Sequence, residues 1–133
     1  MTKSLQRIDA AAFLLHHDKY VILTHVRPDG DTLGSASALC LGLRSLGKTA
    51  YILENNGVSP RFAWMVEGLT TETAEESDTV ISTDVASPGM LPENAQHLLN
   101  RVALRIDHHG SATSFSKLEL VDPDSASCAE VVF

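Results

Sequence analysis

The sequence is poor in positive charge and in long apolar runs, and each deficit excludes a class of protein. Ten Lys and Arg residues face 17 Asp and Glu residues, which leaves a net charge of −7. A protein that binds long nucleic acid needs a basic surface to neutralise phosphates, so a long nucleic acid is not favoured as a partner. No apolar run approaches a membrane span, and no secretory apolar segment follows the first residues. We therefore expect a cytoplasmic protein without a membrane partner.

Two common ligand-binding motifs are also missing. The two cysteines, Cys40 and Cys128, belong to no CxxC or Cys/His zinc pattern, and we expect both to be small buried hydrophobic residues in a reducing compartment. The segment from Gly30 to Gly34 lacks the GxxxxGK[ST] spacing and its lysine. The sequence therefore predicts neither a thiolate zinc site nor a P-loop.

Hydrophobic residues make up 44% of the chain and charged residues only 20%, which is enough apolar material for a folded core. Apolar, β-branched runs alternate with segments of helical periodicity. The expected strands are 20–25, 50–53, 79–83, 102–106 and 118–121, and the expected helices are 5–17, 33–46, 62–66, 92–99 and one from 126 onward. Residues 70–78 are expected to be a solvated loop. This alternation predicts an α/β fold with an open, mostly parallel sheet and helices on both faces.

Potential metal ligands follow three of these strands. The first strand is followed by His25, Asp29 and Asp31, the third by Asp84, and the fourth by Asp107, His108 and His109. Ligands of open α/β sheets bind beyond the carboxyl ends of the strands, so these groups are expected to converge at one edge.

Each group also has a structural interpretation. Asp29 and Asp31 could cap the following helix, Asp84 could end a strand in a turn, and His108 with His109 could be a polar strand exit. Their occurrence together at three strand ends favours a metal site. Three further histidines have no such setting and are expected to be surface residues of helices: His16, His17 and His97.

The type of ligand indicates the metal. A mixed set of imidazoles and carboxylates suits Mn²⁺ best, with Mg²⁺, Fe²⁺ or Co²⁺ as alternatives. Several carboxylates in one site can offset four positive charges, which favours a pair of ions over a single ion.

Four segments resemble the motifs of one enzyme family. THVRPDGDTLGSASAL resembles the first motif of the DHH phosphoesterases, Asp84 falls where their second motif has its aspartate, IDHHGS resembles the motif that names the family, and VDPDSASCAEVVF resembles the segment after it. The resemblance runs from about residue 5 to the end. It is strongest to the nanoRNase and pAp-phosphatase-like subgroup, whose relatives include RecJ, cyclic-di-AMP phosphodiesterases and family II pyrophosphatases.

The resemblance implies a hydrolase that cleaves phosphate esters of short oligonucleotides or 3′,5′-bisphosphonucleotides by a two-metal mechanism. It distributes the candidate residues over two ions and the phosphate: His25 and Asp29 on one ion, Asp31 and His108 on the other, Asp84 bridging both, His109 at the scissile phosphate, and Asp107 supporting the histidines. The alternatives are a family II-like inorganic pyrophosphatase and a non-catalytic nucleotide-binding domain.

The resemblance also sets expectations about domain organisation. Residues 1–133 are expected to be the metal-binding domain, truncated at its C-terminal end, with a second DHHA1-type domain and a further metal-ligating aspartate beyond Phe133. Hydrolysis by residues 1–133 alone is then expected to be weak or absent, and a homodimer remains open. Two positions depart from the family pattern: Ala112, where an Asn often follows the DHH motif, and Met90, where a basic residue often follows the second motif.

Overall fold

The computed structural model describes residues 2–110 and 114–133, and its centre is a seven-stranded sheet. All six strand pairings are parallel, in the order β1-β7-β6-β5-β2-β3-β4. The strands are β1 (Lys3–Ser4), β2 (Tyr20–Leu23), β3 (Ala50–Leu53), β4 (Thr70–Thr71), β5 (Thr79–Thr83), β6 (Val102–Asp107) and β7 (Leu118–Val121). The expected open, parallel α/β sheet is confirmed.

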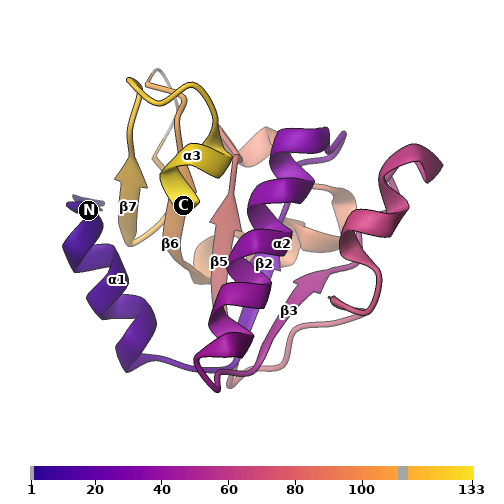
Figure 1. The fold of residues 1–133 in the computed structure, drawn as a ribbon, viewed down its shortest axis with the longest axis horizontal. Helices are drawn as coiled ribbons and strands as arrows, with labels where there is room; N and C mark the ends of the chain where they lie inside the picture. The colour runs from indigo at the N-terminus through magenta and orange to yellow at the C-terminus, as the bar shows by residue number, and fades with distance from the viewer. Residues whose placement is uncertain (1, 111–113) are drawn as a thin grey trace.

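Helices cover both faces of the sheet. The α-helices α1 (Arg7–His16), α2 (Gly30–Ser45) and α3 (Cys128–Val132) pack against one face, and the 3₁₀ helix η3 (Glu93–Arg101) packs against the other. Figure 1 shows α2 and α3 in front of the sheet. Strand β2 contributes to both cores, because Tyr20 and Ile22 face the α-helices while Val21 and Leu23 face η3. Within the described ranges, no helix has the length and hydrophobicity needed to cross a membrane.

Helix α2 links the site to the core. It begins behind Asp29, whose side chain accepts a hydrogen bond from the backbone N–H of Thr32, as N-cap residues do. It ends before Gly47, whose positive φ of 82° allows the chain to turn back toward β3. Between these ends its buried face packs on the sheet, with Cys40 fully buried and its Sγ 3.4 Å from the carbonyl oxygen of Ala50. The expectation of a buried Cys40 is confirmed, and Cys128 in α3 is also buried and free.

Several predicted boundaries differ from the structure. The helix expected at 92–99 is the 3₁₀ helix η3, whose two buried residues, Ala95 and Leu98, are three apart and therefore lie on one side of it. Residues 70–78 are not entirely loop, since Thr70 and Thr71 form β4 beside β3.

Three elements have ends that differ from the prediction. The first strand ends at Leu23 rather than at residue 25, α2 begins at Gly30 rather than at residue 33, and α3 begins at Cys128 rather than at residue 126. The short helix expected at 62–66 is the 3₁₀ helix η1 (Pro60–Val66), and a second one, η2 (Pro88–Met90), was not expected.

The strand order reverses between β2 and β5. From β2 the chain moves outward through β3 and β4, and from β5 it moves outward in the opposite direction through β6 and β7. A crevice at such a switch point, beyond the carboxyl ends of the two strands, is where open α/β sheets bind ligands. In Figure 1 these strand ends point toward the top of the view, where α2 begins.

Candidate metal and phosphate site

The loop after β2 carries His25. The side-chain amide of Asn55, which follows β3, donates hydrogen bonds to the carbonyl oxygen of His25 at 2.8 Å and to the hydroxyl of Thr24 at 2.9 Å. The Nδ1 atom of His25 accepts a hydrogen bond from the backbone N–H of Arg27 at 3.3 Å. A neutral ring that accepts at Nδ1 carries its proton on Nε2. Asn55 meanwhile fixes the backbone that carries the ring.

Asp29 is both a helix cap and a member of the site. Its Oδ1 accepts from the backbone N–H of Thr32 at 2.9 Å and lies 3.0 Å from the Thr32 hydroxyl. Burial raises the pKa of Asp29, but these two hydrogen bonds and the nearby His25 outweigh it, so the pKa lies below its ordinary value. The capping interpretation and the ligand interpretation are therefore compatible, because the cap uses only one carboxylate oxygen.

Asp84 is held at the end of β5 in an unusual conformation. Its φ is 60°, and its backbone N–H donates to the carbonyl oxygen of Ile106 at 2.9 Å, which fixes it against β6. The side chain is buried, and among the described residues its Oδ1 has no hydrogen-bond partner. Burial raises the pKa of Asp84; the Thr32 hydroxyl opposes this, while the carboxylates of Asp31 and Asp107 raise the pKa further. A buried carboxylate with an unsatisfied oxygen is a position that a cation would stabilise.

The fourth strand end carries the Asp-His-His sequence. Asp107 is fully buried, and its Oδ1 accepts from the backbone N–H of His108 at 2.7 Å and lies 2.6 Å from Nδ1 of His109. The Nε2 atom of His108 lies 3.4 Å from Oδ1 of Asp84 and 3.6 Å from Oδ2 of Asp31. His108 therefore lies between the carboxylate of β5 and a carboxylate of α2.

Asp31 also joins two helices. It lies in the first turn of α2, and its two oxygens accept hydrogen bonds, each of 2.9 Å, from the backbone N–H groups of Cys128 and Ala129 at the start of α3. This contact stabilises the N-terminus of α3, where negative charge is favourable. It also brings α3 to the edge of the site.

The candidate ligands form two groups that share one residue. Ligand atoms of His25, Asp29 and Asp84 lie within 4.8 Å of one another, and so do ligand atoms of Asp84, Asp107, His108 and His109. Asp31 belongs to neither group and reaches the site through its contact with His108. Carboxylates crowded in this way repel one another, and together with the imidazoles they suit divalent cations that take oxygen and nitrogen ligands.

Comparison with known proteins identifies the family. The N-terminal domain of the DHH family matches residues 19–133. The chain belongs to the DHH family. It is 34% identical over 113 residues to the bifunctional oligoribonuclease and PAP phosphatase NrnA of Thermus thermophilus, which covers 84% of this chain and 34% of that protein. It is 25% identical over 123 residues to the probable bifunctional oligoribonuclease and PAP phosphatase NrnA of Streptococcus mutans, covering 87% of this chain and 37% of that one.

A solved structure has the same fold. The crystal structure of an exopolyphosphatase-related protein from Bacteroides fragilis superposes with a TM-score of 0.80 at 26% identity, covering 96% of this chain and 42% of that one. This DHH chain thus spans about a third of the length of the curated relatives it matches.

The remaining sequence predictions for the DHH chain concern residues outside the site. His16 and His97 are exposed, and His17 stacks on Phe13 and contacts its carbonyl oxygen, so the expectation of surface helix histidines is confirmed. Met90 packs against the core on the η3 side of the sheet, and its carbonyl oxygen accepts a hydrogen bond from the backbone N–H of Val26 at 2.6 Å. This position therefore supplies no positively charged side chain. Ala112 lies outside the described residues.

Sequence reasoning missed three polar residues of the DHH site: Thr32, Asn55 and Arg105. Each has at least one partner that lies far away in the sequence or on another strand, and the one available signal was the polar residue Arg105 inside an apolar strand pattern.

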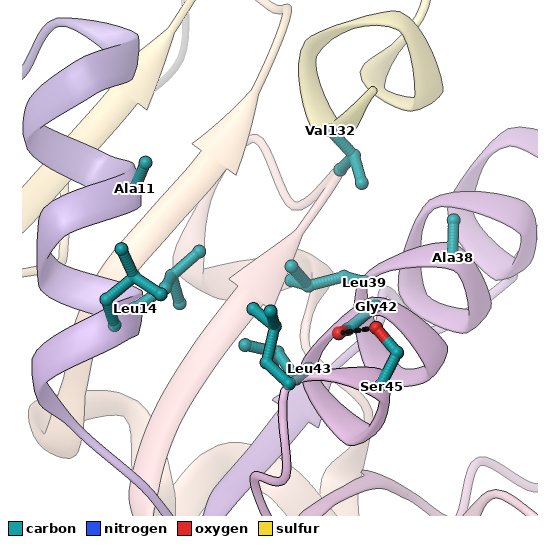
Figure 2. Close-up of a pocket in the computed structure, with 10 residues that line it drawn as sticks. Ala11, Leu14, Ala38, Leu39, Gly42, Leu43, Ser45 and Val132 are labelled. Carbon is teal, nitrogen blue, oxygen red and sulfur yellow. Dashed lines mark hydrogen bonds between the residues drawn. The ribbon is translucent and has the colours of Figure 1, made fainter.

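An apolar pocket of the DHH domain lies elsewhere. Figure 2 shows it between α1 and α2, beside Val132 of α3, with a volume of about 370 Å³. Its lining is almost entirely carbon, and the hydroxyl of Ser45 donates to the carbonyl oxygen of Gly42 at 2.6 Å. A lining without charged groups or converging donors does not suit a phosphate.

Proposed function

We propose that this protein is a divalent-metal-dependent phosphoesterase that hydrolyses phosphate esters of short oligonucleotides or 3′,5′-bisphosphonucleotides. The observation that carries the proposal is the position of Asp84, whose carboxylate belongs to both groups of ligand atoms. A shared carboxylate between two sets of ligands is what a two-metal site requires. The printed names of the relatives from Thermus thermophilus and Streptococcus mutans, oligoribonuclease and PAP phosphatase, support the substrate class.

The residues present fit such cations. Asp84 has a buried oxygen that lacks a partner among the described residues, and the surrounding donors are carboxylate oxygens and imidazole nitrogens. In our assignment His25 and Asp29 would hold one ion, Asp31 and His108 would hold the other, and Asp84 would contribute a carboxylate to both. This donor set favours Mn²⁺, with Mg²⁺ or Co²⁺ as alternatives. When bound, such a pair lowers the pKa of a water molecule and offsets negative charge on the phosphate oxygens.

The side chain of His109 is partly exposed at the edge of the site. It is 42% exposed, whereas its partner Asp107 is fully buried. Because a carboxylate oxygen accepts hydrogen bonds, the 2.6 Å contact assigns the proton on Nδ1 of His109 to the bond with Asp107. We assign to Nε2 the contact with a phosphate oxygen, which requires the imidazolium form, because only then do both ring nitrogens carry a proton and Nε2 donate to the charge that develops during hydrolysis.

The charge of the chain favours a small substrate. With a net charge of −7, the protein has no excess of basic residues to follow a long phosphate backbone, whereas cations in the site would attract a short phosphorylated nucleotide. The two free, buried cysteines are consistent with a cytoplasmic location, where thiols stay reduced.

A second candidate reaction is the hydrolysis of phosphoanhydrides such as pyrophosphate. It is favoured by the structural similarity to the exopolyphosphatase-related protein of Bacteroides fragilis. Two bridged cations would serve a phosphoanhydride as well as an ester, because both reactions are in-line displacements at phosphorus.

One activity panel tests these proposals. The full-length protein is incubated with Mn²⁺ and, separately, with 3′,5′-bisphosphoadenosine, dinucleotides, cyclic dinucleotides and pyrophosphate. We expect the bisphosphonucleotide and the dinucleotides to be hydrolysed. Turnover of pyrophosphate alone would favour the second candidate, and binding of nucleotide without turnover would identify a non-catalytic domain.

The matched variants are Asp84→Asn, which keeps the shape and tolerates a positive φ, and His16→Ala and His97→Ala as controls. We expect Asp84→Asn to lower kcat/KM roughly a thousandfold, or ~4 kcal/mol of transition-state stabilisation, and both controls to match the wild type. An Asp84→Asn enzyme with near-normal turnover would contradict the two-metal assignment.

A further inference from the structure

Arg105 is a buried cation in the middle of the sheet. It lies in β6 between Leu104 and Ile106, and only 2% of its side chain is exposed. Arginine is almost never fully buried unless it is paired with acids. Burial of the charge therefore needs an explanation that the hydrophobic core does not supply.

The guanidinium joins two carboxylates on adjacent strands. Its Nη1 donates to Oδ2 of Asp107 at 3.0 Å, and its Nη2 donates to Oε2 of Glu119 at 2.7 Å. Arg105 and Glu119 are direct partners in the β6–β7 register, while Arg105 and Asp107 are two residues apart on the same side of β6. The ring of Phe115 packs 5.5 Å from the guanidinium carbon.

Stability alone does not account for this arrangement. Removing charges from water costs several kcal/mol per ion, and a buried ion pair is generally no more stabilising than well-packed apolar residues of similar volume. Apolar side chains at 105 and 119 could complete the same sheet. A two-armed donor does have a geometric effect, because it fixes the orientation of both carboxylates at once.

The contact through Asp107 continues into the site. Arg105 binds Oδ2 of Asp107, and the opposite oxygen, Oδ1, meets the backbone N–H of His108 and Nδ1 of His109. Rotation of the Asp107 carboxylate would break the bonds on both sides. A single residue, Asp107, thus connects Arg105 to the His109 ring and can transmit the effect of Arg105 on the orientation of that ring.

We propose that Arg105 is a positioning residue: by bridging Asp107 and Glu119 it fixes the Asp107 carboxylate, which in turn holds His109 with Nδ1–H toward Asp107 and Nε2 toward the substrate phosphate. The inference rests on the proposed phosphoesterase function for its kinetic consequence. Partners that orient the residues of metal sites in this way typically contribute about ten- to a hundredfold to activity.

The test is a double-mutant cycle in the full-length enzyme. Arg105→Met is made in the wild-type and in the His109→Ala background. We expect kcat to fall about ten- to a hundredfold in the first background, with KM changed less than about twofold, and kcat to change less than about twofold in the second. An equal fall in both backgrounds, or no fall in either, overturns the proposal, because a general structural defect does not depend on His109.

Arg105→Lys covers the case in which the Met variant does not fold. Lysine keeps the charge but cannot bind two carboxylates with the geometry of a guanidinium, so we expect a smaller loss of kcat that again disappears in the His109→Ala background. Wild-type activity for Arg105→Lys would contradict the proposal that a guanidinium must bind both carboxylates at once. The matched control is Arg101→Met, since Arg101 donates to the carbonyl oxygens of Glu75, Glu76 and Asp78 at the other end of β6. We expect it to lower the melting temperature without changing kcat.

A spectroscopic measurement separates this proposal from the proposed function. The short hydrogen bond from Nδ1–H of His109 to Asp107 should give a downfield proton NMR resonance, assigned by its absence from His109→Ala. We expect folded Arg105→Met or Arg105→Lys to lose or broaden this resonance and Arg101→Met to keep it. Retention in the Arg105 variants overturns the positioning role. A wild-type protein that hydrolyses nothing in the panel refutes the proposed function, and the resonance then decides the positioning role alone.

Discussion

The hydroxyl of Thr32 lies 2.8 Å from Oδ2 of Asp84, although the two residues are 52 positions apart. The same hydroxyl lies 3.0 Å from Oδ1 of Asp29, in the loop that follows β2. Thr32 therefore stands between the carboxylates that follow β2 and β5, at the point where the strand order reverses. A hydroxyl has one proton, so it donates to one carboxylate at a time.

Replacing Thr32 tests this contact. Thr32→Val keeps the shape but removes the hydroxyl, which leaves the buried Asp84 without its hydrogen bond. We expect the cation-free protein to lose about 1–3 kcal/mol of unfolding free energy and hydrolysis to fall about tenfold or more. Urea unfolding in the presence of a chelator and a rate measurement with Mn²⁺ check the two effects. Thr32→Ser, which keeps the hydroxyl, should retain most of the unfolding free energy and most of the hydrolysis rate. Equal losses in Thr32→Val and Thr32→Ser would contradict the role of the contact.

A second prediction concerns pH and the contact between Arg7 of α1 and Asp122 after β7. The hydrogen bond from Arg7, at 2.7 Å, together with those from Ser125 and Asp124, holds the pKa of Asp122 below its ordinary value. A lowered native pKa stabilises the fold above the unfolded pKa of about 3.9, and this contribution is lost as the pH falls through the native pKa. Asp122→Asn should therefore reduce the unfolding free energy at pH 7, and the difference from wild type should shrink at acidic pH.

Chemical unfolding of the wild type and of Asp122→Asn, from pH 7 down to acidic pH, measures the difference in their unfolding free energies. Asp124→Asn is the control, because the Asp124 side chain is exposed beside the same contact. A difference between wild type and Asp122→Asn that stays constant down to the lowest pH would contradict the prediction.

Two glycines should respond to alanine in opposite ways. A Cβ at Gly57 would overlap the carbonyl oxygen of Val26, in the loop that carries His25, whereas a Cβ at Gly42 in α2 would meet nothing within 4 Å. We expect Gly57→Ala to cost about 1–3 kcal/mol and to weaken Mn²⁺ binding. Gly42→Ala should stabilise the protein by about 0.5–1 kcal/mol, because alanine is the better helix former. Thermal unfolding and a metal titration compare the two, and a Gly57→Ala protein as stable as wild type would show that the loop shifts freely.

The strands were predictable where local pattern and tertiary structure agree. The bounds of β3, β5 and β7 match the sequence prediction because each is a short apolar or β-branched run bounded by polar residues. The strands β1 and β4 have two residues each and carry no pattern of their own, since their pairing depends on the neighbours β7 and β3. Strand pairing of that kind is a property of the assembled sheet.

The site was predictable in its acids and histidines but not in the groups that hold them. Asp84 and His108 follow strands directly, so the sequence places them at one edge of a parallel sheet. Thr32, Asn55 and Arg105 contact partners on other elements, and apart from the charge of Arg105 inside an apolar strand, nothing local distinguishes their side chains from ordinary helix, loop or strand residues. Their roles depend on register, such as the pairing of Arg105 with Glu119.

The reversal of strand order between β2 and β5 has a consequence for folding kinetics. One half of the candidate site follows β2 and the other half follows β5 and β6, so neither half is complete before these distant strands pair. Pairing of strands so far apart in sequence is slow, because the chain must close a long loop first. A cation that needs both halves binds after this step and leaves the folding rate unchanged. It should instead slow unfolding, since the ion must leave before β2 and β5 can separate.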